Sequence, residues 1–115
     1  ADALELSGHN WLGLGKKKVP TFYLERAKAV RAAVTLPLIL VGGIRKMEEI
    51  DAILEAGIDF VSASRPFICQ PDFYQHLEKG EASPCIGCTK CLGNIWSKEG
   101  RRCVKHEIPE GFPKE

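Results

Sequence analysis

The residues with the clearest chemical potential are four cysteines near the end of the chain. Cys85, Cys88 and Cys91 are separated by two residues each, and Cys103 follows after eleven more. Thiols at two-residue gaps in a short turn can converge on one centre, and a distant fourth thiol can complete the shell. This spacing predicts a 4Fe–4S cluster. Structural zinc is the main alternative, although zinc sites more often use two separated cysteine pairs. Disulfides are disfavoured, because cysteines this close in sequence bridge poorly.

A fifth cysteine, Cys69, lies outside this spacing in an apolar Phe-Ile-Cys context. Free cysteine behaves as a small hydrophobic residue when it has no reactive partner. We therefore expect Cys69 to be a buried packing residue and assign it no part in the metal site.

The composition bounds the class of protein. The chain has 115 residues and a net charge of +1, so it is long enough for one modest domain and carries no strong attraction to nucleic acid or membranes. No apolar stretch approaches the roughly 20 residues that cross a bilayer, and the start of the chain does not resemble a secretion signal. Free thiols fit a reducing compartment, so we expect a cytoplasmic protein.

The hydrophobic pattern predicts three strands that alternate with three helices. Leu36–Val41 is a continuous apolar run, typical of a parallel strand covered on both faces. In the following helix Met47, Ile50, Ile53 and Leu54 are expected to face inward, and Gly57 is expected to end it. The predicted strands are residues 2–7, 36–41 and 59–64, and the predicted helices are residues 20–34, 46–56 and 71–79.

Strands and helices that alternate with short connections indicate an α/β fold of right-handed parallel (β/α) units. Such units form either a small open sheet or part of a (β/α) barrel. Glycine and polar residues at the carboxyl ends of the strands, where barrels place their sites, favour the barrel. We predict a partial barrel segment over residues 1–80, followed by a cysteine-rich, cluster-binding tail over residues 81–115.

Several motifs in this order resemble the old yellow enzyme family. They are V-G-G-I-R at Val41–Arg45, D-F-V-S-A-S-R-P-F at Asp59–Phe67, Q-P-D-F at Gln70–Phe73, and C-I-G-C-T-K-C from Cys85. More narrowly, the set resembles the NADH:flavin oxidoreductases related to 2,4-dienoyl-CoA reductase and trimethylamine dehydrogenase. D-A-L-E-L-S-G, from Asp2, resembles the sixth barrel strand of that family, so the resemblance covers almost the whole chain but only strands six to eight of eight.

The resemblance implies a TIM barrel that holds FMN at the carboxyl ends of its strands. Gly42 and Gly43 match the phosphate-binding loop after strand seven, and Ser64 and Arg65 match the loop after strand eight. Close backbone approach at glycine and an arginine charge are what a phosphate requires. Ser64 stands where the family usually carries glycine, so a positive φ at this position would be unfavourable.

The resemblance also implies an activity for the full-length parent, that of an NAD(P)H-dependent flavin oxidoreductase. NADH or NADPH would reduce FMN, which would then reduce an electron-poor C=C bond or pass single electrons to the 4Fe–4S cluster. The four cysteines Cys85, Cys88, Cys91 and Cys103 would carry that relay. No catalytic acid can be assigned, because the family supplies it from strands that have no counterpart here. We expect the segment alone to be inactive towards a small-molecule substrate, and its open sheet edges to favour homo-oligomers.

Three other functions remain open on the residues alone. A zinc-stabilised interaction domain would use the cysteines structurally, without colour or redox activity. A small stand-alone iron–sulfur electron carrier would bind a cluster without flavin. A phosphate-binding barrel of an aldolase-like or synthase-like type would use Gly42 and Gly43 but leaves the cysteines unexplained.

Overall fold

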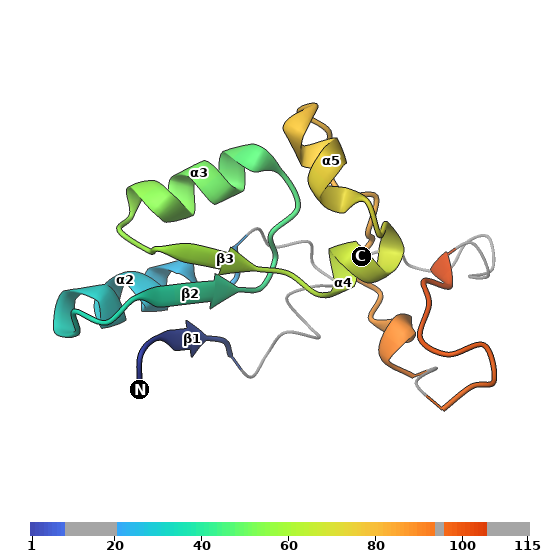
Figure 1. The fold of residues 1–115 in the computed structure, drawn as a ribbon, viewed down its shortest axis with the longest axis horizontal. Helices are drawn as coiled ribbons and strands as arrows, with labels where there is room; N and C mark the ends of the chain where they lie inside the picture. Colours follow the sequence, from blue (N-terminus) through green and yellow to red (C-terminus); the bar gives the residue numbers. More distant parts are fainter. Residues whose placement is uncertain (9–20, 94–95, 106–115) are drawn as a thin grey trace.

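The computed structural model describes residues 1–8, 21–93 and 96–105 of the chain. Its centre is a parallel sheet of three strands in the order β1–β2–β3 (Figure 1). The strands are β1 (Leu4–Leu6), β2 (Leu38–Val41) and β3 (Phe60–Ser62). All three predicted strands are confirmed, each shorter than expected, and the predicted α/β class with parallel (β/α) units is confirmed with them.

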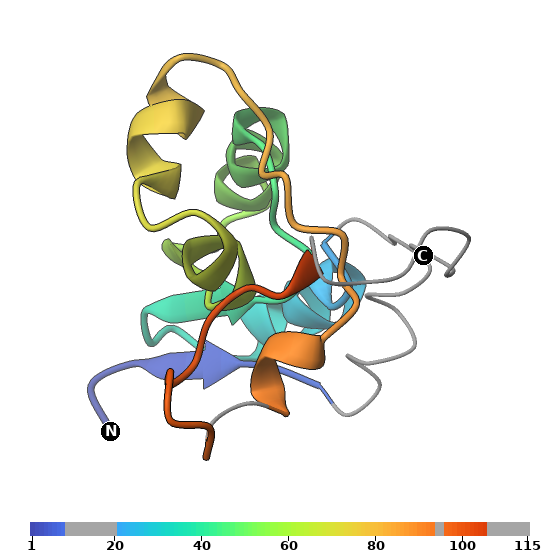
Figure 2. The ribbon, with the colours of Figure 1, turned by 90° about the vertical axis from the view of Figure 1, so that its right-hand side faces the viewer.

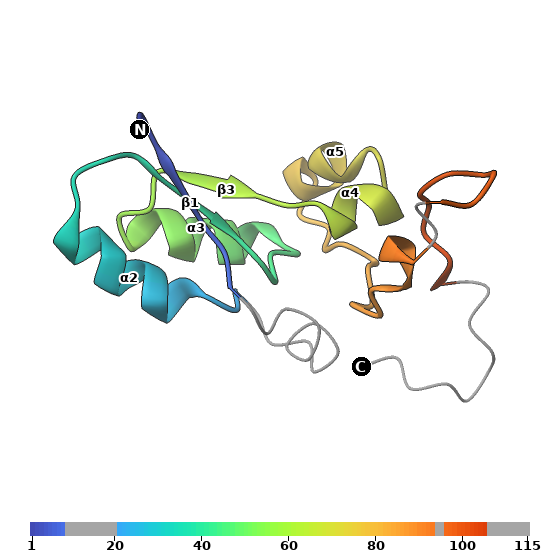
Figure 3. The same cartoon turned by 90° about the horizontal axis from the view of Figure 1, so that it is seen from below.

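Two helices connect the strands and lie on one face of the sheet (Figure 3). They are α2 (Leu24–Ala33) and α3 (Met47–Glu55). This arrangement follows from right-handed crossovers that advance in one direction, since each crossover places its helix on the same side. The first helix begins later than predicted, because Thr21 has a φ of +43°, outside the helical region. Pro20 and the rest of residues 9–20 lie outside the described residues.

The core lies between the sheet and these helices. Leu38, Leu40 and Ile53 are fully buried there, and Ala27 of α2 packs against them. Two burial predictions are wrong. Leu54 is 46% exposed, because it lies off the buried face of α3 that Ile53 defines. The second face of β2 is only partly covered, since Ile39 and Val41 are half-buried.

Two short helices follow the last strand, α4 (Arg65–Cys69) and α5 (Phe73–Glu78). Helix α5 was predicted over residues 71–79, but α4 was not predicted. The sequence signal that could have indicated α4 is Pro66 in its first turn, a position that suits proline because no backbone N–H is needed there. Gly57 ends α3 with a φ of +93°, as predicted.

The cysteine-rich segment lies beyond the carboxyl ends of the strands. Figure 2 looks onto that end of the sheet, where α4 and residues 81–93 and 96–105 lie in front of the strands. Apart from one 3-10 turn at Lys90–Leu92, the described part of this segment is irregular. None of the helices in the described part of the chain has the length and hydrophobicity that a bilayer crossing requires.

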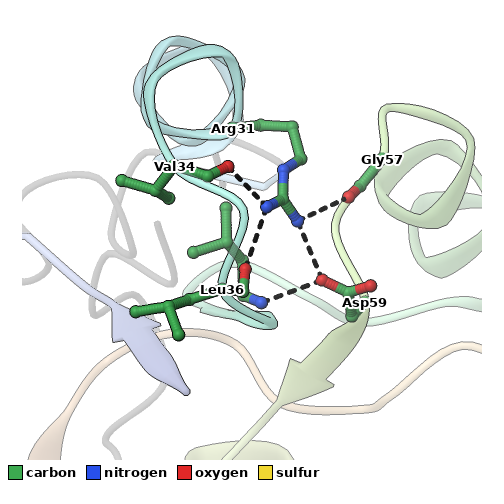
Figure 4. A network of polar contacts seen from close by, with 6 residues as sticks. Arg31, Val34, Leu36, Gly57 and Asp59 are labelled. Carbon is green, nitrogen blue, oxygen red and sulfur yellow. Dashed lines mark hydrogen bonds and ion pairs between the residues drawn. The ribbon is translucent and has the colours of Figure 1, made fainter. Parts of the chain in front are cut away.

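The opposite end of the sheet is tied together by Arg31 (Figure 4). Its guanidinium donates to the carbonyl oxygens of Val34 at 2.7 Å and Leu36 at 2.9 Å, and to the Asp59 carboxylate at 2.9 Å. The same carboxylate oxygen of Asp59 accepts the backbone N–H of Leu38 at 2.9 Å. One side chain therefore joins the end of α2 to the starts of β2 and β3.

Arg31→Lys should lower the free energy of unfolding by about 2 kcal/mol, because an ammonium cannot serve these divergent acceptors together. Urea denaturation measures the loss. Lys28→Ala is the matched control, since the Lys28–Glu25 pair is exposed and should contribute less than about 0.5 kcal/mol. Equal midpoints for the two variants would contradict the assigned role of Arg31.

His76 on α5 should make stability depend on pH. Its Nε2 lies 3.1 Å from an oxygen of Asp72, and its Nδ1 contacts the Glu81 carboxylate. The hydrogen bond to Glu81 is the largest cause that raises the pKa of His76 above its ordinary value of 6.5, and Asp72 adds to it. A raised folded-state pKa stabilises the fold fully below the unfolded pKa, and this contribution is lost as pH rises through the folded pKa. His76→Gln should therefore destabilise the chain more at about pH 5.5 than at about pH 8.5. A pH-independent difference between the two proteins would contradict this.

Candidate functional site

The first part of the site is a pocket at the carboxyl ends of β2 and β3, here called the glycine pocket. It has a volume of about 70 Å³, and all four residues predicted to bind phosphate line it: Gly42, Gly43, Ser64 and Arg65. Parallel strands bring their carboxyl ends to one edge, so residues about twenty positions apart in the chain meet there. The four residues lie together, as the resemblance implied. That they bind a phosphate stays a prediction.

The glycine turn is fixed by backbone contacts. The carbonyl oxygens of Gly42 and Gly43 accept the N–H groups of Phe22 at 3.2 Å and Thr21 at 3.0 Å. Gly43 has a φ of +71°, and a Cβ there would lie 2.6 Å from the Phe22 ring, so the turn excludes any side chain. Ser64 has a φ of −118°, so its replacement of the expected glycine causes no backbone strain.

The second part of the site, here called the thiol pocket, has a volume of about 20 Å³. The four predicted ligands Cys85, Cys88, Cys91 and Cys103 line it, and so does Cys69. Cys69 is four residues after Arg65 in α4, and residues at this helical spacing share a face. Because α4 was not predicted, the sequence reading placed Cys69 among the packing residues and missed its position beside the four ligands.

Backbone contacts bring the cysteine segment to the sheet. The Arg45 carbonyl accepts the N–H of Ser83 at 2.7 Å, and the Ser83 hydroxyl accepts the N–H of Cys85 at 3.2 Å. Lys105, two residues past Cys103, donates to the Pro84 carbonyl at 3.1 Å. These bonds hold both ends of the segment together, and Cys85 consequently lines the glycine pocket as well as the thiol pocket.

Arg65 links the two pockets. It lines both, and its Nη1 donates to the Thr89 hydroxyl at 3.0 Å. Thr89 follows Cys88 directly, is buried, and donates its own hydroxyl to the Gly87 carbonyl at 3.2 Å. Its φ of +66° is costly for a β-branched residue, by about 1–3 kcal/mol, so these contacts hold a strained turn inside the cysteine motif.

The thiols differ in burial: Cys91 is buried, whereas Cys69, Cys85, Cys88 and Cys103 are half-buried, so Cys69 is less buried than predicted. Burial is the largest cause that raises the pKa of Cys69, to about 11, and the neighbouring Cys103 thiol adds to it. Burial also raises the pKa of Cys91, and the nearby Cys85 and Cys88 raise it further, while the charge of Arg65 opposes them. In the described residues, no group of three or more His, Cys, Asp or Glu side chains is close enough to hold a metal ion. The thiols therefore line one pocket without forming a closed ligand shell, and a metal would have to draw them together and displace their protons.

A third, more open hollow adjoins the glycine pocket and is here called the edge pocket. It has a volume of about 170 Å³ and extends across all three strand ends. Ser7 follows β1, Gly42 follows β2, and Ser64 and Arg65 follow β3. Tyr23, just before α2, and Leu92, from the cysteine segment, also line the pocket. The carboxyl edge of the sheet is therefore hollowed along its whole width.

Comparisons with known proteins point in two directions. The chain is 33% identical over 108 residues to a 4,4'-dithiodibutanoate disulfide reductase of Rhodococcus erythropolis, covering 87% of this chain and 26% of the relative. It is 31% identical over 88 residues to the imidazole glycerol phosphate synthase subunit HisF of Corynebacterium diphtheriae, covering 76% of this chain and 29% of the relative. The HisF subunit of Elusimicrobium minutum is 34% identical over 62 residues, covering 54% of this chain and 25% of the relative.

The chain thus spans about a quarter of the length of these relatives. No solved structure matches it. The reductase is an oxidoreductase, the class that the cysteine motif and the flavin-enzyme resemblance predicted. The HisF subunits instead correspond to the synthase-like phosphate barrel, the alternative that left the cysteines unexplained.

The family model that matches is described as "Histidine biosynthesis protein" and covers residues 17–105, which is most of the chain. It is a family of TIM barrels, so the three parallel (β/α) units described above are consistent with part of a barrel. The matched model is not that of the old yellow enzyme family, which the motifs at Val41–Arg45 and Asp59–Phe67 resemble. On this match, the chain belongs to the histidine biosynthesis protein family of TIM barrels.

Proposed function

We propose that this chain is the C-terminal barrel segment of a flavin-dependent oxidoreductase, with an FMN phosphate in the glycine pocket and a 4Fe–4S cluster in the thiol pocket. One observation carries the proposal. Arg65 lines both pockets, so the residues suited to an anion and the residues suited to a metal are adjacent parts of one site. A phosphate-binding barrel without redox chemistry offers no reason for that adjacency.

The glycine pocket suits a phosphate chemically. The left-handed conformations of Gly42 and Gly43 leave no side chain over the turn, and Arg65 brings a guanidinium charge to the same pocket. The exposed Ser64 adds a hydroxyl that can donate to an anion. Bound FMN would supply the hydride chemistry, with NADH or NADPH as the electron source.

The thiol pocket suits a soft metal centre, because cysteine thiols supply its sulfur donors and Ile68, Ile86 and Val104 form apolar parts of its wall. Cys85, Cys88, Cys91 and Cys103 would be the ligands, and a bound cluster would supply single-electron transfer. The Arg65–Thr89 bond would keep the central part of the ligand loop in place. Zinc is the alternative occupant of the same four thiols.

The substrate class follows from the reductase relative. The Rhodococcus protein is named for the reduction of an organic disulfide. We propose a small molecule with a reducible bond, either such a disulfide or an electron-poor C=C bond.

Anaerobic iron–sulfide reconstitution tests the cluster. The wild-type chain should gain a broad brown absorbance that dithionite bleaches, and Cys88→Ser should not, because it removes a predicted ligand. Cys69→Ser is the matched control, since it removes a thiol of the same pocket that the spacing does not require. If the wild-type protein stays colourless but binds one equivalent of zinc, the cluster assignment is wrong and the four thiols form a structural zinc site. Equal loss in both variants would contradict the assignment of the four ligands.

Titration with FMN, followed by its fluorescence, tests the flavin. Arg65→Ala should weaken FMN binding about tenfold or more, because it removes the charged partner of the phosphate. Arg26→Ala on the exposed face of α2 should leave the affinity unchanged. Affinity that is the same in the wild type and Arg65→Ala would rule out the phosphate assignment.

The family match favours a second candidate, a phosphate-ester enzyme of the histidine-biosynthesis type. The HisF subunits are synthase components whose name includes a phosphorylated compound. In that case the glycine pocket would bind a phosphate ester and the cysteines would stabilise the tail. This candidate predicts binding of inorganic phosphate by the wild-type chain, no preference for FMN over other phosphate esters, and no brown absorbance after reconstitution.

A further inference from the structure

The hydroxyl of Tyr23 has no role in the fold described above. Tyr23 is 7% exposed and belongs to the core. Its hydroxyl is buried as well, and it has no hydrogen-bond partner among the described residues. Buried polar atoms are almost always hydrogen-bonded, and one left unpaired costs about as much as a lost hydrogen bond. An orphaned donor of this kind suggests a partner from outside the chain.

The position of the hydroxyl follows from the contacts of the ring. A Cβ added at Gly8 would lie 2.1 Å from Cε1 of Tyr23, and one added at Gly42 would lie 3.0 Å from Cε2. The two ring atoms that flank the hydroxyl-bearing carbon therefore pack against two glycine backbones. Gly8 follows β1 and Gly42 follows β2, so the hydroxyl lies between the carboxyl ends of these strands.

The ring is held in this place. Phe22 packs against it edge-on, with ring centroids 5.6 Å apart, and the N–H of Phe22 is bonded to the Gly42 carbonyl at 3.2 Å. Tyr23 is also the residue from which α2 starts. Because the backbones of Gly8 and Gly42 and the Phe22 ring pack around it, the tyrosine ring is held in place, and the hydroxyl is positioned before any ligand arrives.

Tyr23 lines the edge pocket together with Ser64 and Arg65. With Ser7, which also lines it, the pocket combines a guanidinium and three hydroxyl groups on a concave edge of the sheet. A ligand that carries hydrogen-bond acceptors and negative charge matches this set, since all four groups can donate. An uncharged apolar ligand would leave the tyrosine hydroxyl unpaired.

We propose that Tyr23 is a ligand-binding residue whose hydroxyl donates a hydrogen bond to an acceptor oxygen of the phosphorylated ligand that Arg65 holds. This inference rests on the proposed function, which assigns the anion to Arg65, and extends it to a residue from the loop that follows β1. The site then draws on all three strand ends.

Tyr23→Phe tests the inference, because it removes only the hydroxyl oxygen. FMN affinity of the full chain should fall about tenfold or more, as expected for loss of a hydrogen bond to a charged acceptor. The midpoint temperature of the ligand-free variant should stay equal to that of the wild type or rise, because an unpaired buried group has been removed. Tyr74→Phe is the matched control, since the Tyr74 side chain is on α5 and 58% exposed.

The outcomes separate the inference from the proposed function. If Arg65→Ala weakens FMN binding and Tyr23→Phe does not, the role of Tyr23 is overturned while the flavin assignment stands. If neither variant changes the affinity, or the wild type binds neither FMN nor inorganic phosphate, both are overturned. A ligand-free Tyr23→Phe chain that melts well below the wild type would show that the hydroxyl has a structural partner, which also overturns the inference.

Discussion

The in-register parallel pairing of the three strands is the constraint on which the rest of the structure depends. Leu6 pairs with Leu40, and Leu40 pairs with Val61, so the three strands end within a residue or two of the same line. That alignment alone places the residues after each strand along one edge. A shift of one residue in the β2–β3 pair would turn the side chains of one strand to the other face of the sheet and move the glycine turn relative to Arg65.

The two ends of the sheet are stabilised by different means. At the amino end Arg31 and Asp59 join both crossovers through bonds to backbone groups, so register is fixed away from the site. At the carboxyl end, backbone bonds from Thr21 and Phe22 shape the glycine turn. The carboxyl end carries the strained residues Thr21 and Thr89 and the unpaired hydroxyl of Tyr23, and such departures from local rules are expected at functional sites.

The sequence predicted what depends on local pattern. Apolar runs located the strands, Gly57 located a helix end, and barrel topology brought Gly42 and Arg65 to one pocket. It did not predict what depends on contacts between distant side chains. The bond from Arg65 to Thr89 joins residues 24 apart, and neither residue's neighbours indicate it. Cys69 was placed among the packing residues because its position beside the thiols depends on α4, a helix too short to leave a periodic signal.

The distribution of strain supports one continuous site across both pockets. In the described part of the chain, the non-glycine residues with positive φ are Thr21 and Thr89. Thr21 donates to the Gly43 carbonyl at the glycine pocket, and Thr89 accepts from Arg65 at the thiol pocket. Strained backbone persists only where surrounding contacts determine it, and it gathers at functional sites. Here both strained residues are bonded to residues of the glycine pocket, so the turn that shapes the anion site and the turn that presents the cysteines are held by the same small set of contacts.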